Sequence, residues 1–591
     1  MVFHMANLNS PKENALIVVA LDFGTTYSGW AYSVRHDFKE NRSDIKTKGG
    51  WKSGDGLVTD KTPTVVLFTH ENKFHSFGYN AESKYAELVD DNKASGWKYF
   101  KRFKMTLFSD ETSQVRRKIS RRRMMNDVNG QKLQSLMVVS ECLRFLRNDF
   151  LKILHENVNF VELKDIHWVL TVPAIWSDQA KQFMRQAANQ AGIEDDLLSL
   201  AYEPEAAAIY CKDITLQKKI VGNNACLSTF DSGHQFLVLD CGGGTVDITA
   251  YEVQTKDQLI ELCPPSGGPW GGAEVDIQFL NIVRKIFGKD VWCEFEKSNM
   301  RDCLDILRMF ESRKKIIGSN NEDTTRLLFP RDLFDKYKET TGREFQSSLG
   351  ITRTRDKLIF PMDVLENLFS KTFNAIIVHV RELLQKPELQ HIRTILMVGG
   401  FSDSELLYQR IKSEFTEINV LRPHDAVSSV LKGAVIFGHT PEVIPERICA
   451  RTYGIACNFP FDAQTHPPEL RQVYDDREMC TDIFQPIVKK GDTIILGKSC
   501  FERQFLPTCS NDDTANIDIF VSPDSNPKYT YSGRGDNVKK LGSLHLNISD
   551  TKKGKNRPIN VRITYESTEI VVTAVEEGTN NVVSKKFDSL V

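Results

Sequence analysis

The sequence predicts an α/β domain followed by a smaller all-β domain, and two observations support this. From Leu16 to about residue 440, short apolar strands alternate with helical stretches, which is typical of mostly parallel sheets. After Pro441, short strands with alternating apolar residues, as in 561–565, are separated by Gly, Asn, Asp and Pro. At 591 residues, the chain is long enough for several domains. We expect a flexible tail over 1–14, the α/β domain over 15–440, a linker over 441–452 and a β-sandwich over 453–591.

Composition excludes several classes of protein. Lys and Arg total 76 against 78 Asp and Glu, a net charge of −2, so nucleic acid is not an expected partner. Twelve Cys without a CxxC pair argue against a disulfide framework and a zinc site, and favour a reducing, cytoplasmic location. The apolar stretch Ala15–Leu21 is too short to span a membrane. The basic segment Arg116–Arg123 is interpreted as a solvated loop or helix face, with a localisation signal that would allow nuclear access as the alternative.

Two strands each end in an aspartate followed by a turn of small residues. Residues 18–27 read VVALDFGTTY, and a second strand follows through Trp30 and Tyr32. The same pattern recurs in residues 236–247, which read FLVLDCGGGTVD. Each segment predicts a β-hairpin with a carboxylate at its bend, and together they indicate an internal duplication.

These turns have the chemistry of a polyphosphate site. Glycine lets backbone N–H groups approach phosphate oxygens, and threonine hydroxyls add donors. The candidates for this cradle are Gly24, Thr25, Thr26, Gly242, Gly243, Gly244 and Thr245. Asp22 and Asp240 would repel a polyphosphate unless a cation intervened, which favours a hydrated Mg²⁺. The sequence therefore predicts that a metal nucleotide is bound.

A third strand, residues 394–398, leads into Gly399 and Gly400 and then into a helical stretch. A strand, a double glycine and a helix suit the packing of a flat ligand ring against the backbone. One such turn is often only a tight turn, but three in this order are a strong indication.

The three turns resemble the nucleotide-binding domain shared by actin, sugar kinases and the seventy-kilodalton heat-shock chaperones. Chaperone-type strings are TVPA at 171–174, YEPEAAAIY at 202–210, FESRKK at 310–315 and HDAV at 424–427. WVLTVPAIW at 168–176 is similar to the divergent twelve-A/twelve-B branch of that family. The resemblance implies an actin-like, duplicated ATPase domain and a peptide-binding β-sandwich, and we expect no helical lid after it.

The resemblance also implies roles for individual residues toward ATP or ADP with Mg²⁺. Asp22 and Asp240 would hold the metal through water, and Glu203 would orient the attacking water. The family's catalytic lysine corresponds to Lys101, Arg102 or Lys104, depending on the alignment. Phosphate, ribose or adenosine contacts would come from Gly271, Gly272, Glu311, Lys314, Lys315, Gly399, Gly400 and Asp425.

Some positions depart from the family pattern. Lys181 stands where the family has the arginine that pairs with its switch proline, and an ammonium lacks the guanidinium fork. Phe401 and Asp403 replace a small polar residue and the adenine-stacking arginine. The linker leucines are missing from 441–452. Interdomain signalling and the grip on the nucleotide should therefore differ from those of the family.

The leading hypothesis is an ATP-binding, slowly hydrolysing chaperone-like protein whose nucleotide state biases the binding of unfolded or extended peptide segments, with a co-chaperone or exchange factor as a further partner. One alternative is a nucleotide-gated scaffold that engages a signalling protein and refolds nothing. A small-molecule kinase of the actin-like superfamily is a third, and the β-rich end argues against it.

Overall fold

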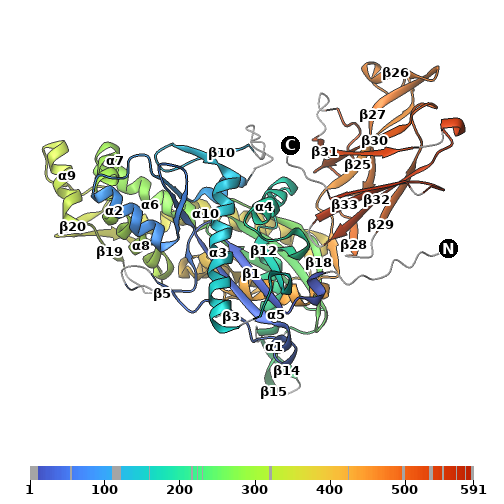
Figure 1. Cartoon of the computed structure of the whole chain (residues 1–591). Helices are drawn as coiled ribbons and strands as arrows, with labels where there is room; N and C mark the ends of the chain where they lie inside the picture. Colours follow the sequence, from blue (N-terminus) through green and yellow to red (C-terminus); the bar gives the residue numbers. More distant parts are fainter. Residues whose placement is uncertain are drawn as a thin grey trace. The chain divides into compact units, whose positions relative to one another are not determined.

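The computed structural model describes most of the chain in two compact units (Figure 1). The first comprises Met1–Ala250 and Ser266–Thr440, and the second comprises Tyr251–Pro265 and Pro441–Val591. The described residues are 11–52, 56, 58–108, 122–158, 160–214, 217–221, 224–228, 230–318, 323–423, 425–495, 500–531, 537–548, 551–566, 569–579 and 581–586. Positions 116–121 of the basic segment and His424 lie outside them.

The first sheet of the larger unit is built around the first predicted hairpin. β1 pairs antiparallel with β2, and Asp22 is the partner of Gly29. On its other side β1 is parallel to β12, which is parallel to β13. β1 is buried along its whole length, which explains its unbroken apolar run. In spatial order the strands are β13 (Leu198–Tyr202), β12 (Ile166–Val172), β1 (Ile17–Phe23), β2 (Tyr27–Val34) and β3 (Lys46–Thr47), and β6 (Thr62–Pro63) also pairs with β2.

The second sheet repeats this order around the second hairpin. β16 and β17 are neighbours joined by the turn 242–245, and β16 is parallel to β22, which is parallel to β23. The strands run β23 (Asn419–Leu421), β22 (Thr394–Val398), β16 (Gln235–Cys241), β17 (Val246–Thr255) and β18 (Gln258–Gly268). The predicted internal duplication is therefore visible in strand order, and the predicted α/β class is confirmed.

Helices and small sheets complete the larger unit (Figure 1). Helix α12 contacts α5 and β1 extensively. The helices are α1 (Arg35–Glu40), α2 (Tyr79–Asp90), α3 (Ser135–Asn157), α4 (Asp178–Gln190), α5 (Glu203–Ile214), α6 (Gly272–Phe287), α7 (Lys289–Ser298), α8 (Met300–Ile316), α9 (Arg331–Thr341), α10 (Met362–Leu384), α11 (Glu405–Glu414) and α12 (Ser429–His439). The small sheets contain β4 (Trp51–Lys52), β5 (Val58–Thr59), β7 (Val65–Phe68), β8 (Phe74–Phe77), β9 (Lys98–Lys101), β10 (Met124–Asn126), β11 (Lys132–Gln134), β14 (Gln217–Val221), β15 (Asn224–Ser228), β19 (Thr324–Leu328), β20 (Thr352–Thr354) and β21 (Lys357–Pro361). None of the described helices is both long and apolar enough to cross a membrane.

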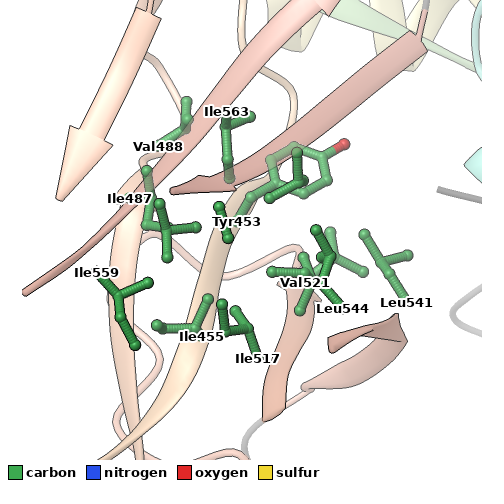
Figure 2. Close-up of a cluster of buried hydrophobic side chains, with 14 of the residues drawn as sticks. Tyr453, Ile455, Ile487, Val488, Ile517, Val521, Leu541, Leu544, Ile559 and Ile563 are labelled. Carbon is green, nitrogen blue, oxygen red and sulfur yellow. The ribbon is translucent and has the colours of Figure 1, made fainter. Parts of the chain in front are cut away.

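The smaller unit contains two antiparallel sheets. One runs β26 (Arg471–Tyr474), β27 (Arg477–Val488), β25 (Thr452–Pro460), β30 (Thr514–Ser522) and β31 (Lys539–Asn547). The other runs β29 (Cys500–Phe505), β32 (Ile559–Glu566), β33 (Glu569–Glu576) and β34 (Val582–Lys586). Ile455 and Ile517 from the first sheet share one buried cluster with Ile559 and Ile563 from the second (Figure 2). The two sheets therefore pack face to face, because each buries its apolar side chains against the other.

Two stretches of the sequence that were expected to be irregular contain regular structure. Residues Pro11–Asn14 of the expected tail form a 3₁₀ turn, and Arg35 donates hydrogen bonds to the carbonyls of Lys12 and Ala15. The expected linker contains a 3₁₀ turn (Pro441–Val443) and β24 (Glu446–Ile448). Within the smaller unit, β24 pairs with β28 (Thr493–Ile495) and, through Glu446, with Ile260 of β18.

Candidate nucleotide site

The two predicted glycine turns face each other in the larger unit. A Cβ built on Gly243 would lie 2.4 Å from Thr26 Oγ1, and one on Gly244 would lie 2.6 Å from Thr25 Oγ1. A Cβ on Gly24 would lie 2.2 Å from the carbonyl oxygen of Tyr27. A side chain at Gly243 or Gly244 would push the two hairpin ends apart, and one at Gly24 would clash with the backbone of its own turn. The duplication thus brings both cradles to one place.

The start of helix α6 packs on the second turn. The backbone N–H of Gly272 donates to the carbonyl of Gly242 at 3.1 Å, and that of Ala273 donates to Gly243 at 2.8 Å. The backbone N–H of Gly271 donates to Gly244 at 3.2 Å. Gly271 and Gly272 therefore lie at the glycine turn, with the positive end of a 16-residue helix beside it.

Three buried carboxylates and one partly buried carboxylate gather beneath the turns. Asp22 and Asp240 are each the second-last residue of their strand, β1 and β16, and are 6% and 4% exposed. Asp247 is buried in β17 and accepts the backbone N–H of Ile175 at 3.1 Å. Glu203 is the first residue of α5, and the Coulomb coupling of Glu203 to Asp22 and Asp247 places it in the same cluster. We refer to these four residues as the acidic cluster.

The acidic cluster perturbs its own protonation. Burial, followed by the charges of Glu203, Asp247 and Asp22, raises the pKa of Asp240 well above its usual value. Burial also raises the pKa of Glu203 to about 7, although Lys104 opposes this shift. Burial alone would raise the pKa of Asp22, but Lys61, Lys104 and the Thr171 hydroxyl hold it below its ordinary value. Lys61 and Lys104 therefore do not fully offset the negative charge of the four carboxylates.

The structure distinguishes the three basic candidates from one another. Lys104 Nζ donates to Glu203 Oε1 at 2.9 Å, is 1% exposed and lies 5.0 Å from the ring centre of Trp176. Arg102 instead donates to Asp276 Oδ2 at 3.0 Å. Lys101 lies 3.7 Å from Glu296. Lys104 is thus the candidate that the fold brings to the acidic cluster.

A second lysine, Lys61, also reaches the cluster. Its Nζ donates to Asp22 Oδ2 at 2.5 Å, and Thr171 Oγ1 donates to the other oxygen, Oδ1, at 3.0 Å. Lys61 lies in the loop immediately before β6, far from any glycine turn in the sequence. The sequence analysis missed it because no motif marks this position.

The donor set fits a hydrated divalent cation. In the described part of the chain, no three His, Cys, Asp or Glu residues are grouped to hold a metal directly. The paired Asp22 and Asp240 suit a Mg²⁺ ion that keeps its own waters and meets the protein through them. The raised pKa of Asp240 is the observation that supports this, since a nearby cation would relieve the crowding of negative charge.

Two of the expected adenosine contacts on α8, Glu311 and Lys314, form an ion-pair network with Asp276 of α6. Lys314 Nζ donates to Asp276 at 2.7 Å, to Glu311 at 2.8 Å and to the carbonyl of Gly272 at 3.3 Å. Burial alone would lower the pKa of Lys314, but Asp276 and Glu311 raise it. Glu311 and Lys314 are thereby connected to the glycine turn through α6.

The departures Phe401 and Asp403 change this side of the site. A Cβ on Gly272 would lie 3.0 Å from the ring of Phe401, so the phenylalanine fills the space beside the start of α6. Lys315 Nζ donates to Asp403 Oδ2 at 3.1 Å. Gly399, at φ +84°, leaves room for Asp240, since a Cβ there would lie 2.4 Å from Asp240 Oδ1.

Other expected residues have partners of their own. Asp425 accepts hydrogen bonds from Tyr210 at 3.0 Å and from Lys432 at 2.8 Å. Gly400 differs from these residues, because a Cβ built on it would have no atom within 4 Å and the space beside it is open. Lys181 donates to Tyr202 Oη at 2.9 Å, directly before Glu203 in the chain.

Asp247, Thr171 and Asp276 belong to the site although no role was predicted for them. Asp247 lies in the second hairpin string, FLVLDCGGGTVD, Thr171 lies in TVPA, and Asp276 lies four residues after the expected contact Gly272. The signal was therefore present for these three residues, in contrast to Lys61.

A duplicated α/β unit whose two glycine turns meet over buried carboxylates is the architecture of the actin-like class of nucleotide-binding ATPase domains. A sequence model of the family described as Hsp70 protein matches residues 19–457, and the chain belongs to the Hsp70 family.

The sequence similarity to relatives with curated descriptions extends over almost the whole chain. Human heat shock 70 kDa protein 12A is 33% identical, over 98% of this chain and 92% of the relative. The mouse protein of the same name is 32% identical over the same shares. Human heat shock 70 kDa protein 12B is 31% identical over 97% and 91%. The chain is thus an Hsp70-like, nucleotide-binding protein similar to the twelve-A and twelve-B members.

Proposed function

We propose that this chain is a slow, Mg²⁺-dependent ATPase whose nucleotide state controls the binding of an extended peptide segment or a partner protein. The observation that carries the proposal is the position of the two glycine turns over the acidic cluster, with Lys104 Nζ 2.9 Å from Glu203 Oε1. Members of the Hsp70 family typically bind ATP or ADP with Mg²⁺.

Each part of the site has a defined task in this proposal. Backbone N–H groups and threonine hydroxyls of the two turns bind the phosphate oxygens. Asp22 and Asp240 hold the hydrated Mg²⁺, which neutralises phosphate charge when it is bound. Glu203 orients a water and accepts its proton, and Lys104 keeps the carboxylate in place and adds positive charge.

The smaller unit is the proposed partner-binding part. Phe459 on β25 and Val473 on β26 are 40% and 64% exposed, and both strands pair with β27. Exposed apolar side chains on the two strands that flank β27 are suited to contact a partner chain. We infer a cytoplasmic location, since the 12 cysteines show no CxxC pair and no regular spacing, which fits a reducing compartment.

A nucleotide-gated scaffold without refolding activity is the second candidate. Phe401 and Asp403 stand where the family has a small polar residue and the adenine-stacking arginine, and Asp403 is held by Lys315. A nucleotide contact altered in this way favours a bound nucleotide that acts as a switch over one that is turned over in a refolding cycle.

A single-turnover ATPase assay with and without an unfolded peptide tests the proposal. We expect slow hydrolysis that changes when peptide is added, and peptide anisotropy that differs between ATP and ADP. The double variant Phe459→Ser/Val473→Ser should weaken peptide binding and leave basal hydrolysis unchanged. Nucleotide binding with no effect of peptide would favour the scaffold, and no nucleotide binding would refute both candidates.

A further inference from the structure

Lys61 occupies a position where a metal-dependent site is expected to have only carboxylates and water. Its Nζ lies 2.5 Å from Asp22 Oδ2, and the side chains of Lys61 and Asp22 are only 12% and 8% exposed. Asp22 is one of the two carboxylates that would face the hydrated metal. A cation that belongs to the protein therefore already holds one side of the site.

The backbone, rather than a flexible side chain alone, sets this position. β6 pairs with β2 through Thr62 and Ser28, which places Lys61 beside Gly29. A Cβ on Gly29 would lie 3.2 Å from Lys61 Cγ, so the lysine stem runs across this glycine. Gly29 is in turn the strand partner of Asp22, and the stem is therefore aimed at the carboxylate.

The loop that carries Lys61 is anchored on its other side. Thr59 Oγ1 donates to the carbonyl of Lys61 at 2.7 Å and lies 3.0 Å from Tyr79 Oη. The backbone N–H of Tyr79 donates to Thr62 Oγ1 at 3.3 Å. Hydrogen bonds on both sides of Lys61 thus hold the loop, so the ammonium is a built part of the site.

The two cations of the acidic cluster are divided between its carboxylates. Lys104 is paired with Glu203, and Lys61 is paired with Asp22. An ammonium at hydrogen-bond distance occupies a carboxylate lone pair to which a metal-bound water would donate.

We propose that Lys61 is a resident cation of the phosphate site, which neutralises Asp22 and binds the polyphosphate, so that this chain binds nucleotide without a divalent metal. This inference rests on the proposed function. Mg²⁺ adds little to nucleotide affinity but remains necessary for hydrolysis. The consequence is a protein that stays loaded with nucleotide when free Mg²⁺ falls.

The test is the affinity of the full chain for ADP, measured by isothermal titration calorimetry with Mg²⁺ and again with excess EDTA. Wild-type affinity should change by no more than about threefold between the two buffers. Lys61→Met should lose about tenfold or more of its affinity in EDTA and regain most of it with Mg²⁺. Lys48→Met is the matched control, because Lys48 forms a similar, mostly buried ion pair with Asp149.

A folding defect is separated from the predicted effect by two further variants. Lys61→Arg keeps the charge and should keep metal-independent binding. Lys61→Met/Asp22→Asn removes both charges, so no buried carboxylate is left unpaired, and thermal melting reports whether it folds.

Equal metal dependence in wild type and Lys61→Met would overturn the inference. If both bind ADP only with Mg²⁺, the proposed function stands and the role of Lys61 is wrong. If neither binds ADP in either buffer, both the proposed function and the inference fail.

Discussion

Asp22 and Asp240 occupy equivalent positions in the two hairpins, yet their surroundings differ. Asp22 accepts hydrogen bonds from Lys61 and Thr171, which keep its pKa low. Burial and three neighbouring carboxylates raise the pKa of Asp240. The two residues should therefore respond differently to the same substitution.

We expect Asp22→Asn to destabilise the free protein by about 3 kcal/mol, because it leaves Lys61 buried without a counter-charge. Asp240→Asn should change stability by less than about 1 kcal/mol, because a neutral amide resembles the protonated carboxyl that the raised pKa favours. Both should slow Mg²⁺-dependent ATP hydrolysis. Urea unfolding and single-turnover assays measure the two effects, and a folded double variant with wild-type turnover would refute the site assignment.

Glu203→Gln should leave nucleotide bound and slow its cleavage, because the carboxylate is proposed to act on water. Since the pKa of Glu203 is raised to about 7, wild-type turnover should rise with pH through that value as the carboxyl ionises. The variant should lose this rise. Calorimetry with ADP and a pH–rate profile are the measurements, and loss of ADP binding would make Glu203 a ligand contact or a structural residue.

Helix α5 is the element that positions Glu203, and its packing against α12 depends on a glycine. A Cβ on Gly433 of α12 would lie 1.7 Å from the carbonyl oxygen of Ala206 in α5. Ala206 follows Glu203 by one helical turn. The approach of the two helices therefore affects both stability and the Lys104–Glu203 contact.

Gly433→Ala should destabilise the larger unit by about 1–3 kcal/mol, because the added methyl group forces α5 and α12 apart. Turnover should also fall, since Glu203 moves with α5. Thermal melting and the ATPase assay check this expectation. Gly49→Ala is the control, because Gly49 is exposed and its Cβ would meet nothing within 4 Å. Equal melting temperatures for wild type and Gly433→Ala would show that the helices adjust freely.

At the scale of the whole molecule, one buried and one partly buried histidine link the stability of the fold to pH. His167 on β12 is bonded to the carbonyl of Gly438 and to Ser199, and His439 is bonded to Ser33 and stacked on Phe38. Burial lowers the pKa of each to about 3, and the charge of Arg35 adds to the effect. An unfolded histidine has a pKa of 6.5.

Below pH 6.5 the two histidines are therefore protonated in the unfolded chain, whereas in the folded chain they stay neutral until about pH 3. Within this window, each histidine should lower the free energy of unfolding by about 1.4 kcal/mol for every unit by which the pH falls. Above pH 6.5 the titration of the two histidines should have no effect on stability. The raised pKa of Glu203 has the opposite effect, because the folded chain gains stability through this group as the pH falls. The contribution of a histidine is therefore measured as the difference between wild type and a histidine variant. The free energy lost by urea unfolding between pH 7.5 and 5.5 should be smaller for His439→Gln than for wild type. Equal losses would contradict the prediction.

Several elements of this fold are predictable from the local sequence. The hairpins at 18–27 and 236–247 were predicted from an apolar run, an aspartate and small residues, and β1–β2 and β16–β17 are found there. The strand 394–398 followed by a double glycine and a helix is also present as β22 and α11. These patterns are short-range, so neighbouring residues alone specify them.

The sequence by itself thus determined the fold class, the duplication, the glycine turns and membership of the Hsp70 family. Only the tertiary structure decided which of three basic residues within 101–104 reaches Glu203. Arg102 has a φ of +55°, and this left-handed turn directs Arg102 and Lys104 to different carboxylates. Lys61 meets Asp22 only because β6 pairs with β2, and no local pattern encodes a contact made through strand pairing 39 residues away.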